Sequence, residues 1–202
     1  MKTLERFLVA TGATLGAILT VTTVASAQDV TFRGKVEDTN PTGFVVAGSN
    51  TVLTSSTVNL NAAVGAHFLV TGTWNGSVSA PSVVVTQLTP VAESFSIGGN
   101  GKLGEFIDFN ALAAPGDLAV VVASLSATMF VPVDGAGVAF IDVTNMLVIG
   151  VGTVGGNGEY KASVLVPNNA ALQGLDLFGQ GVVFPQSGAP FATNPDFKTL
   201  GN

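Results

Sequence analysis

Short apolar stretches separated by Gly- and Asn-rich turns recur from about residue 30 to the end of the chain, and this pattern limits the fold most strongly. Val30-Thr31-Phe32-Arg33-Gly34-Lys35-Val36 alternates apolar and polar side chains, which is typical of a strand with one buried face. The later stretches lack the 3.6-residue apolar period of an amphipathic helix. With 25 glycines among 202 residues, the chain is therefore predicted to be all-β.

The segment 28–90 is predicted to form a small β-barrel. Strands are expected at residues 30–36, 44–47, 65–72 and 82–88, with one or two more between residues 51 and 60. The dipeptide Asn75-Gly76 tolerates the positive φ angles of a type I′ turn, so a tight hairpin is expected there. Because its strands are consecutive, this segment is expected to fold on its own.

Four pieces of the same segment carry a resemblance to a known family. They are the opening strand Phe32-Arg33-Gly34-Lys35-Val36, the strand at 43–46, the stretch from Val64 to Gly72, and the closing strand Val83-Val84-Val85. On these pieces the segment resembles an OB-like domain of unknown function that recurs in exported bacterial proteins. The resemblance implies a barrel and implies no particular chemistry.

The segment 91–202 is predicted to form a β-sandwich or jelly-roll-like domain, with Thr89-Pro90 marking the boundary. Its stretches at 118–123, 127–131 and 146–151 are apolar at nearly every position, which suits strands that are covered on both faces. In a two-sheet sandwich such cover must come from a loop, from the other domain or from another subunit. One helical turn is expected near residues 167–174.

A second resemblance covers the C-terminal part of the chain. Its pieces are the small-residue turn at 169–172, the pattern Gly-Leu-x-Leu-x-x-Gln-x-x-Val at 174–183, and Thr193-Asn194 before the last strand. These pieces resemble a C-terminal β-sandwich of exported proteins from planctomycete-like bacteria, although Pro195-Asp196 interrupts the final strand here. The resemblance implies fold and export and no activity.

The first 27 residues have the pattern of an export signal. Lys2 and Arg6 precede an uncharged stretch from Phe7 to Val24, and Ala25-Ser26-Ala27 is a small-x-small cleavage site. The alternative is an uncleaved membrane anchor, which the threonines and glycines of that stretch disfavour. We therefore expect cleavage after Ala27, no membrane span afterwards, and a secreted or periplasmic protein.

Charge and cysteine content exclude several classes of function. The chain carries 7 basic and 13 acidic side chains, so it would repel a phosphate backbone and is not expected to bind nucleic acid. It has no cysteine, and thus no disulfide, no thiolate nucleophile and no Cys-ligated zinc.

Catalytic groups are scarce. His67 is the single histidine and lies within an apolar stretch, where a wall position bonded to a backbone carbonyl is expected rather than a catalytic base. A glycosidase would need two facing carboxylates. The acids that could supply such a pair, none singled out by spacing, are Glu93, Glu105, Asp108, Asp117, Asp134, Asp142, Glu159 and Asp176.

No cofactor or metal is expected. Oxygen ligands are the main kind in supply, which makes calcium the more suitable metal. Asp142 with Asn145, and Asp108 with Asn110, could each offer two oxygens, but neither pair matches a calcium-binding loop. The two Gly-Gly-Asn-Gly segments at 98 and 155 lack the phosphate-loop pattern and are expected to be hairpin turns.

Trp74 is the candidate ligand-binding residue. Beside Asn75-Gly76 its indole could form an exposed platform for a sugar or a base; alternatively it folds back and covers one end of the barrel. Together these features predict a non-catalytic exported module that binds other proteins or itself. The alternative is a carbohydrate-binding protein that uses Trp74 or a groove on the sandwich face.

Overall fold

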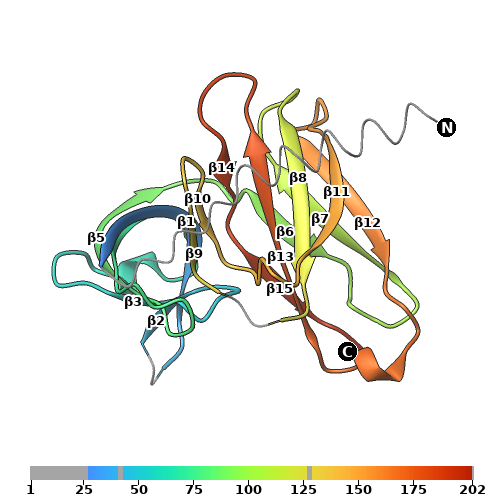
Figure 1. The fold of residues 1–202 in the computed structure, drawn as a ribbon, viewed down its shortest axis with the longest axis horizontal. Coiled ribbons are helices and arrows are strands. Elements are labelled where there is room, and N and C mark those ends of the chain that lie inside the picture. The colour runs from blue at the N-terminus through green and yellow to red at the C-terminus, as the bar shows by residue number, and fades with distance from the viewer. Residues whose placement is uncertain (1–26, 41–42, 127–128, 202) are drawn as a thin grey trace.

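A computed structural model describes residues 27–40, 43–126 and 129–201, and its first five strands close into a barrel (Figure 1). The strands are β1 (Gln28–Asp38), β2 (Phe44–Val46), β3 (Val52–Thr54), β4 (His67–Trp74) and β5 (Ser82–Pro90). Their order around the barrel is β1-β2-β3-β5-β4; β3 and β5 are parallel, and the other neighbours are antiparallel. The predicted OB-like barrel is thereby confirmed.

Alternation in the sequence sets which side chains enter the barrel. In β1, Val30, Phe32 and Val36 are buried, whereas the residues between them face outward or are partly exposed. The stretch from 51 to 60 forms only β3, because the chain then turns into the 3₁₀ turn η1 (Asn61–Ala63). Leu60 and Ala63 of this connection belong to the barrel core and cover one end of it.

The prediction of a tight two-residue hairpin at Asn75-Gly76 is wrong. Gly76 has a φ of 81°, but no residue other than glycine has positive φ in the part of the chain described, so Asn75 cannot take its place in a type I′ turn. A seven-residue loop instead joins β4 to β5. Asn75 organises this loop with its side chain, accepting hydrogen bonds from the amides of Ser77 and Ser82 and donating one to the carbonyl of Ala80.

The second unit is a β-sandwich. One sheet has the order β12-β7-β6, and the other has the order β11-β8-β13-β14, with β15 also paired to β13. The strands are β6 (Phe95–Gly98), β7 (Phe106–Leu112), β8 (Leu118–Ser124), β11 (Leu147–Thr153), β12 (Glu159–Leu165), β13 (Asp176–Phe184), β14 (Phe191–Ala192) and β15 (Asp196–Thr199). The expected helical turn is η2 (Ala170–Leu172), capped by the side chain of Asn169. Within the described ranges all regular structure other than these two 3₁₀ turns is strand, which confirms the all-β fold.

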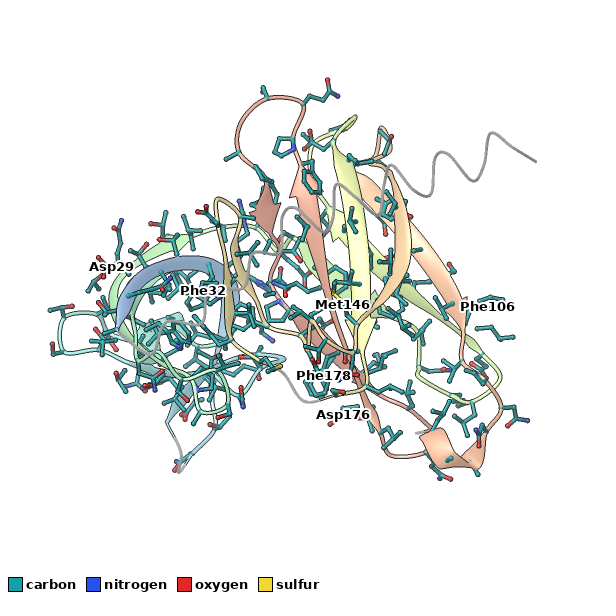
Figure 2. All side chains as sticks on the ribbon, in the orientation of Figure 1. Asp29, Phe32, Phe106, Met146, Asp176 and Phe178 are labelled. Atoms are coloured by element: carbon teal, nitrogen blue, oxygen red, sulfur yellow. The ribbon has the colours of Figure 1, made fainter. Side chains whose placement is uncertain are left out.

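Strand β8 is covered on both faces, as its continuous apolar sequence predicts. Ala119, Val121 and Ala123 face the core between the two sheets. Val120 and Val122 face the other way and pack with Ile141, from the chain that follows β10 (Gly137–Ala139). Figure 2 shows Met146 and Phe178 on this barrel-facing side of the sandwich, with Phe106 on the far side.

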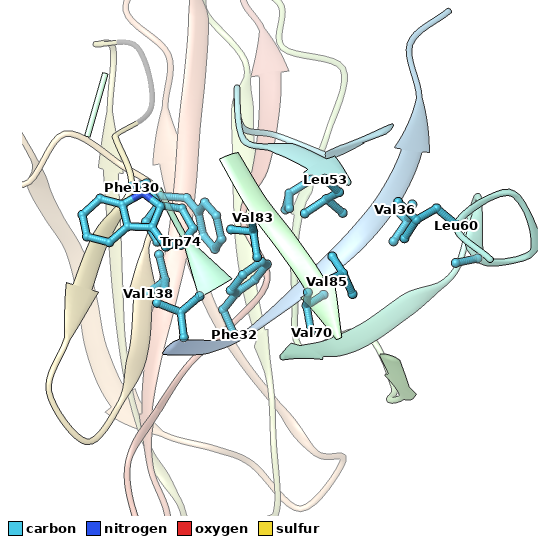
Figure 3. Packing of buried hydrophobic residues seen from close by; sticks show 14 residues of the cluster. Phe32, Val36, Leu53, Leu60, Val70, Trp74, Val83, Val85, Phe130 and Val138 are labelled. Carbon is cyan, nitrogen blue, oxygen red and sulfur yellow. The ribbon is translucent and has the colours of Figure 1, made fainter. Parts of the chain in front are cut away.

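A short hairpin between the two units closes the other end of the barrel. It consists of β9 (Val131–Val133) and β10, paired antiparallel. The side chains of Phe130, Val138 and Phe140 are buried in the same cluster as the residues of the barrel wall. Figure 3 shows Phe130 and Val138 beside Trp74 and Phe32, at the opposite end of the core from Leu60. The barrel core is therefore completed by residues that follow it in sequence.

The proposed boundary at residue 90 stays a prediction, as does independent folding of 30–90. The buried position of Phe130, Val138 and Phe140 bears on both, because a barrel made of residues 28–90 alone would lack these side chains. Residues 1–26 of the predicted 27-residue signal peptide, including its uncharged stretch, lie outside the described residues.

Candidate functional site

Trp74 lies in the barrel core, and the expectation of an exposed platform is corrected. Its exposed fraction is 2%, its indole stacks on Phe130, and its Nε1 donates a hydrogen bond of 3.0 Å to the carbonyl oxygen of Ser77. With both faces inside the protein, the indole offers no surface on which a sugar or base could stack. The alternative that Trp74 covers one end of the barrel is what the structure shows.

His67 begins strand β4 and is mostly buried. Its Nε2 lies 3.8 Å from a carboxylate oxygen of Glu93, whereas its Nδ1 is buried with no hydrogen-bond partner among the described residues. The expected bond to a backbone carbonyl is thus absent here, and an acid distant from His67 in sequence lies nearby instead. A His–Glu contact of this length, without a nucleophile beside it, does not form a catalytic triad.

Several of the candidate acids hold turns and strand pairs through hydrogen bonds. Asp117 accepts hydrogen bonds from the amides of Ala114 and Gln186, and the Asp176 carboxylate accepts one from Thr199 Oγ1. Glu105 and Glu159 accept bonds from nearby asparagine side chains. The contacts of Glu105, Glu159 and Asp117 with residues nearby in sequence are typical of acids in turns, whereas Asp117 and Asp176 also bond residues distant in sequence.

The aspartates of the two oxygen pairs considered for calcium are engaged in other contacts, whereas Asn110 Oδ1 is buried without a hydrogen-bond partner among the described residues. Asp142 accepts hydrogen bonds from Thr144 and Asn145, which hold its pKa at about 2. Asp108 lies 2.6 Å from Lys161 Nζ and accepts a bond from Ser163; these two partners lower its pKa. Across the residues with described positions, no group of three or more His, Asp and Glu side chains could hold a metal ion.

A groove of about 540 Å³ runs between the barrel and the β9–β10 hairpin. Arg33 lines it, with its guanidinium carbon 4.4 Å from the centre of the Phe191 ring, and partial burial lowers its pKa. Asp29 and Asp134 line the same groove. The groove therefore combines one cation with two carboxylates next to solvent.

The most distinctive surface is the outer edge of strand β11, which we call the open edge and define as Leu147–Thr153. Strand β11 ends the order of its sheet, so its backbone pairs with β8 on one side and, among the described residues, with no strand on the other. Its side chains include neither charge nor proline, and Leu147, Val148 and Val151 are 69%, 52% and 40% exposed. A sheet edge of this kind is a template for pairing with another strand.

The opposite end of the sandwich is closed by side chains. Asp196 accepts a 2.7 Å hydrogen bond from the amide of Ile97 in β6. The buried amide of Asn194 accepts bonds from the amides of Ser94 and Phe95 and donates one to the carbonyl of Phe95. Edge groups of β6 that could pair with another chain are thus already bonded.

The sequence shows that residues 146–151 are apolar, but it does not indicate that several of their side chains are exposed to solvent. The sequence pattern of β11 resembles that of β8, and only the strand order shows that β8 is central while β11 is at the edge. A bulge between Val148 and Gly150 is a further feature that the sequence did not indicate, although Gly150 within a strand is compatible with one.

Two further observations complete the description of the chain. Among the residues whose positions are described, none belongs to a helix long and apolar enough to cross a membrane. Comparison of the chain with protein-family models, with curated proteins and with solved structures gives no match.

Proposed function

We propose that the protein is an exported, non-catalytic structural or protein-interaction module of the bacterial envelope or extracellular space. Its interaction surface is the open edge, which accepts a strand of another polypeptide and extends the sheet of β11 and β8. The single observation that carries the proposal is an uncharged sheet edge with large apolar side chains in solvent. Strand addition supplies affinity through main-chain hydrogen bonds and needs no catalytic group.

Export is supported by the sequence of the first 27 residues. A basic start, an uncharged stretch and Ala25-Ser26-Ala27 are the three parts of a secretory signal. Cleavage after Ala27 would release a chain that begins at Gln28, the first residue of β1. We further propose that residues 28–90 belong to the OB-like domains of exported bacterial proteins, and that the sandwich is related to the C-terminal sandwich of planctomycete-like proteins.

The absence of catalysis is supported by what the candidate groups contact. His67 has Glu93 beside its Nε2, its Nδ1 has no hydrogen-bond partner among the described residues, and the carboxylates of Asp117 and Asp142 stabilise turns. A low pKa for Asp142 keeps that carboxyl ionised, which is unsuited to a general acid near neutral pH.

The test of this proposal is binding of a strand peptide to the exported form of the protein. A soluble, fluorescently labelled peptide of alternating valine and threonine with flanking lysines serves as the probe, and fluorescence anisotropy measures its binding. Val151→Lys should weaken binding at least tenfold, because a lysine at this position disfavours strand addition. Val84→Lys, at an exposed position on barrel strand β5, is the matched control and should bind as the wild type does. Equal binding by both variants, or none by the wild type, would contradict the proposal.

Carbohydrate binding is the second candidate, and the groove beside Arg33 favours it. Trp74 no longer supports this function, but Arg33 has no hydrogen bond or ion pair to a protein group within the described ranges. Its N–H groups, with the carboxylates of Asp29 and Asp134, could bind sugar hydroxyls. Calorimetric titration with neutral and acidic oligosaccharides, comparing wild type with Arg33→Gln, tests this candidate; binding that is lost in the variant would support it.

A further inference from the structure

We propose that the partner at the open edge is a second copy of this chain, paired antiparallel through β11 about a two-fold axis near Val151. This inference rests on the proposed function and names its partner. Pairing would join the two β11 strands into one continuous sheet running from β14 of one copy to β14 of the other. The interface would be isologous, with the same surface on both subunits.

The regular part of β11 fixes where the pairing lies. A bulge between Val148 and Gly150 bends the strand, whereas the residues from Gly150 to Thr153 keep an unbroken register with β8. Val151 lies inside this regular part and is 40% exposed. A two-fold axis at Val151 would therefore pair regular backbone with regular backbone and bring the two valine side chains together.

The distribution of charge in the chain allows a second copy to approach at this edge. The protein carries a formal net charge of −6, so two copies repel each other across most approaches. The open edge has no charged side chain, so two copies can meet there without opposing carboxylates. The electrostatic repulsion between two copies is therefore expected to be weakest when they meet at this surface.

The second sheet adds charge complementarity. Strand β12 ends the other sheet on the same side, and its Tyr160 ring packs against Gly150 and Gly152 of β11. An axis near Val151 therefore also passes close to Tyr160. Antiparallel approach of the two β12 strands about Tyr160 places Glu159 of each copy opposite Lys161 of the other, and opposite charges across strands are stabilising. Lys161 also pairs with Asp108 of its own copy at 2.6 Å, so the contact with Glu159 would add to an existing ion pair.

Such an assembly stops at two copies. The open edge and the β12 edge lie on the same side of the sandwich, and one isologous contact uses both. The β6 end is bonded to Asn194 and Asp196, and the barrel is closed. A dimer of this kind removes the exposed edge that would otherwise promote aggregation.

Sedimentation of the exported form measures the assembly directly. The wild type should sediment as a dimer, Val151→Lys should raise the dimer dissociation constant at least tenfold, and Val84→Lys should leave it unchanged. A wild type that stays monomeric at all concentrations would overturn the inference. If that monomer still binds the strand peptide through Val151, the proposed function stands and only the identity of the partner is wrong. A dimer that is equally stable in Val151→Lys would also overturn it, because the contact would then lie elsewhere.

The absence of cysteine allows a sharper test of the geometry. Val151→Cys introduces the only thiol of the chain, and the two-fold axis sets it opposite its own copy. Directly opposed residues of antiparallel strands have Cα atoms roughly 4.5–5.5 Å apart, within the range that a disulfide spans. Under mild oxidation this variant should form a covalent dimer rapidly at low protein concentration, and Val84→Cys should not. Equal cross-linking of the two variants would contradict the proposed axis.

Discussion

The ring of Phe130 stacks on the indole of Trp74, with centroids 5.1 Å apart and ring planes 27° apart. Trp74 ends barrel strand β4, whereas Phe130 directly precedes the β9–β10 hairpin. Phe130 also meets Phe32 and Phe140 edge-on. Through this contact the barrel is completed by a segment that lies within the sandwich part of the sequence.

Phe130→Ala should destabilise the whole protein by about 3–5 kcal/mol, the usual cost of truncating a buried phenylalanine. The cavity would open beside Trp74, so the fluorescence of the single tryptophan should report the change. Urea unfolding followed by this fluorescence and by circular dichroism measures it. Phe106→Ala, at a 62% exposed position, should change stability little. Equal effects of the two substitutions would show that Phe130 does not complete the barrel core.

Gln180→Leu should destabilise the protein by about 1–3 kcal/mol, the cost of leaving buried polar groups unbonded. The Gln180 side chain accepts a bond from the Phe140 amide and donates bonds to the carbonyls of Val138 and Thr193, joining the hairpin to the sandwich. Hydrogen exchange should quicken at the Phe140 amide in particular. The exposed Gln87→Leu is the control, and unchanged exchange at Phe140 in Gln180→Leu would argue against this link.

Gly72→Ala should lower stability by about 1–3 kcal/mol, because it inserts a methyl group where there is no room. A β-carbon at Gly72 would meet the backbone carbonyl oxygen of Val84 and a methyl of Val83 at the bulge between β4 and β5. Backbone cannot move aside as a flexible side chain can. Gly156→Ala, with open space around it, should be tolerated. Thermal unfolding of both variants makes the comparison, and equal midpoints would contradict this packing.

Asp142→Asn should reduce the acid sensitivity of the protein. Hydrogen bonds from Asn145 and Thr144 hold the pKa of Asp142 at about 2, below its ordinary 3.8. A carboxyl group whose pKa is lower in the folded than in the unfolded state stabilises the fold at pH values above its unfolded-state pKa. This stabilisation is lost as the pH falls through its folded-state pKa. The wild type should therefore be more stable than Asp142→Asn at neutral pH, by about 1 kcal/mol.

The difference between these two proteins should shrink between about pH 4 and pH 2. Thermal midpoints measured from pH 6 to pH 2 test this expectation, with Asp134→Asn in the exposed β9–β10 turn as the control. A difference that stays constant down to pH 2 would show that the ionised form of Asp142 is not what the fold stabilises.

Local patterns in the sequence were sufficient to predict several strands, but the stretch expected as a strand at 127–131 enters one only at Val131, where β9 begins. Alternation in residues 30–36 identified β1 and its buried face, and the register of a strand follows from such alternation. The prediction from local sequence failed at Asn75. Its side chain forms hydrogen bonds with three backbone groups of a longer loop, so the residue does not form a two-residue turn. The hydrogen bonds of the buried Gln180 and Asn194 could not be predicted from local sequence, because most of their partners are distant in sequence.

The sequence by itself determined that this chain is all-β, where several strands begin, and that it has no thiol chemistry. Only the tertiary structure decided which apolar stretches are buried. The stretches in β8 and β11 are alike in composition, yet β8 lies between two neighbours and two covering layers while β11 has an uncovered edge. Trp74 likewise is buried because Phe130 lies over it. Burial depends on which segments meet in space, and that is set by strand order and packing across the whole chain rather than by any single stretch.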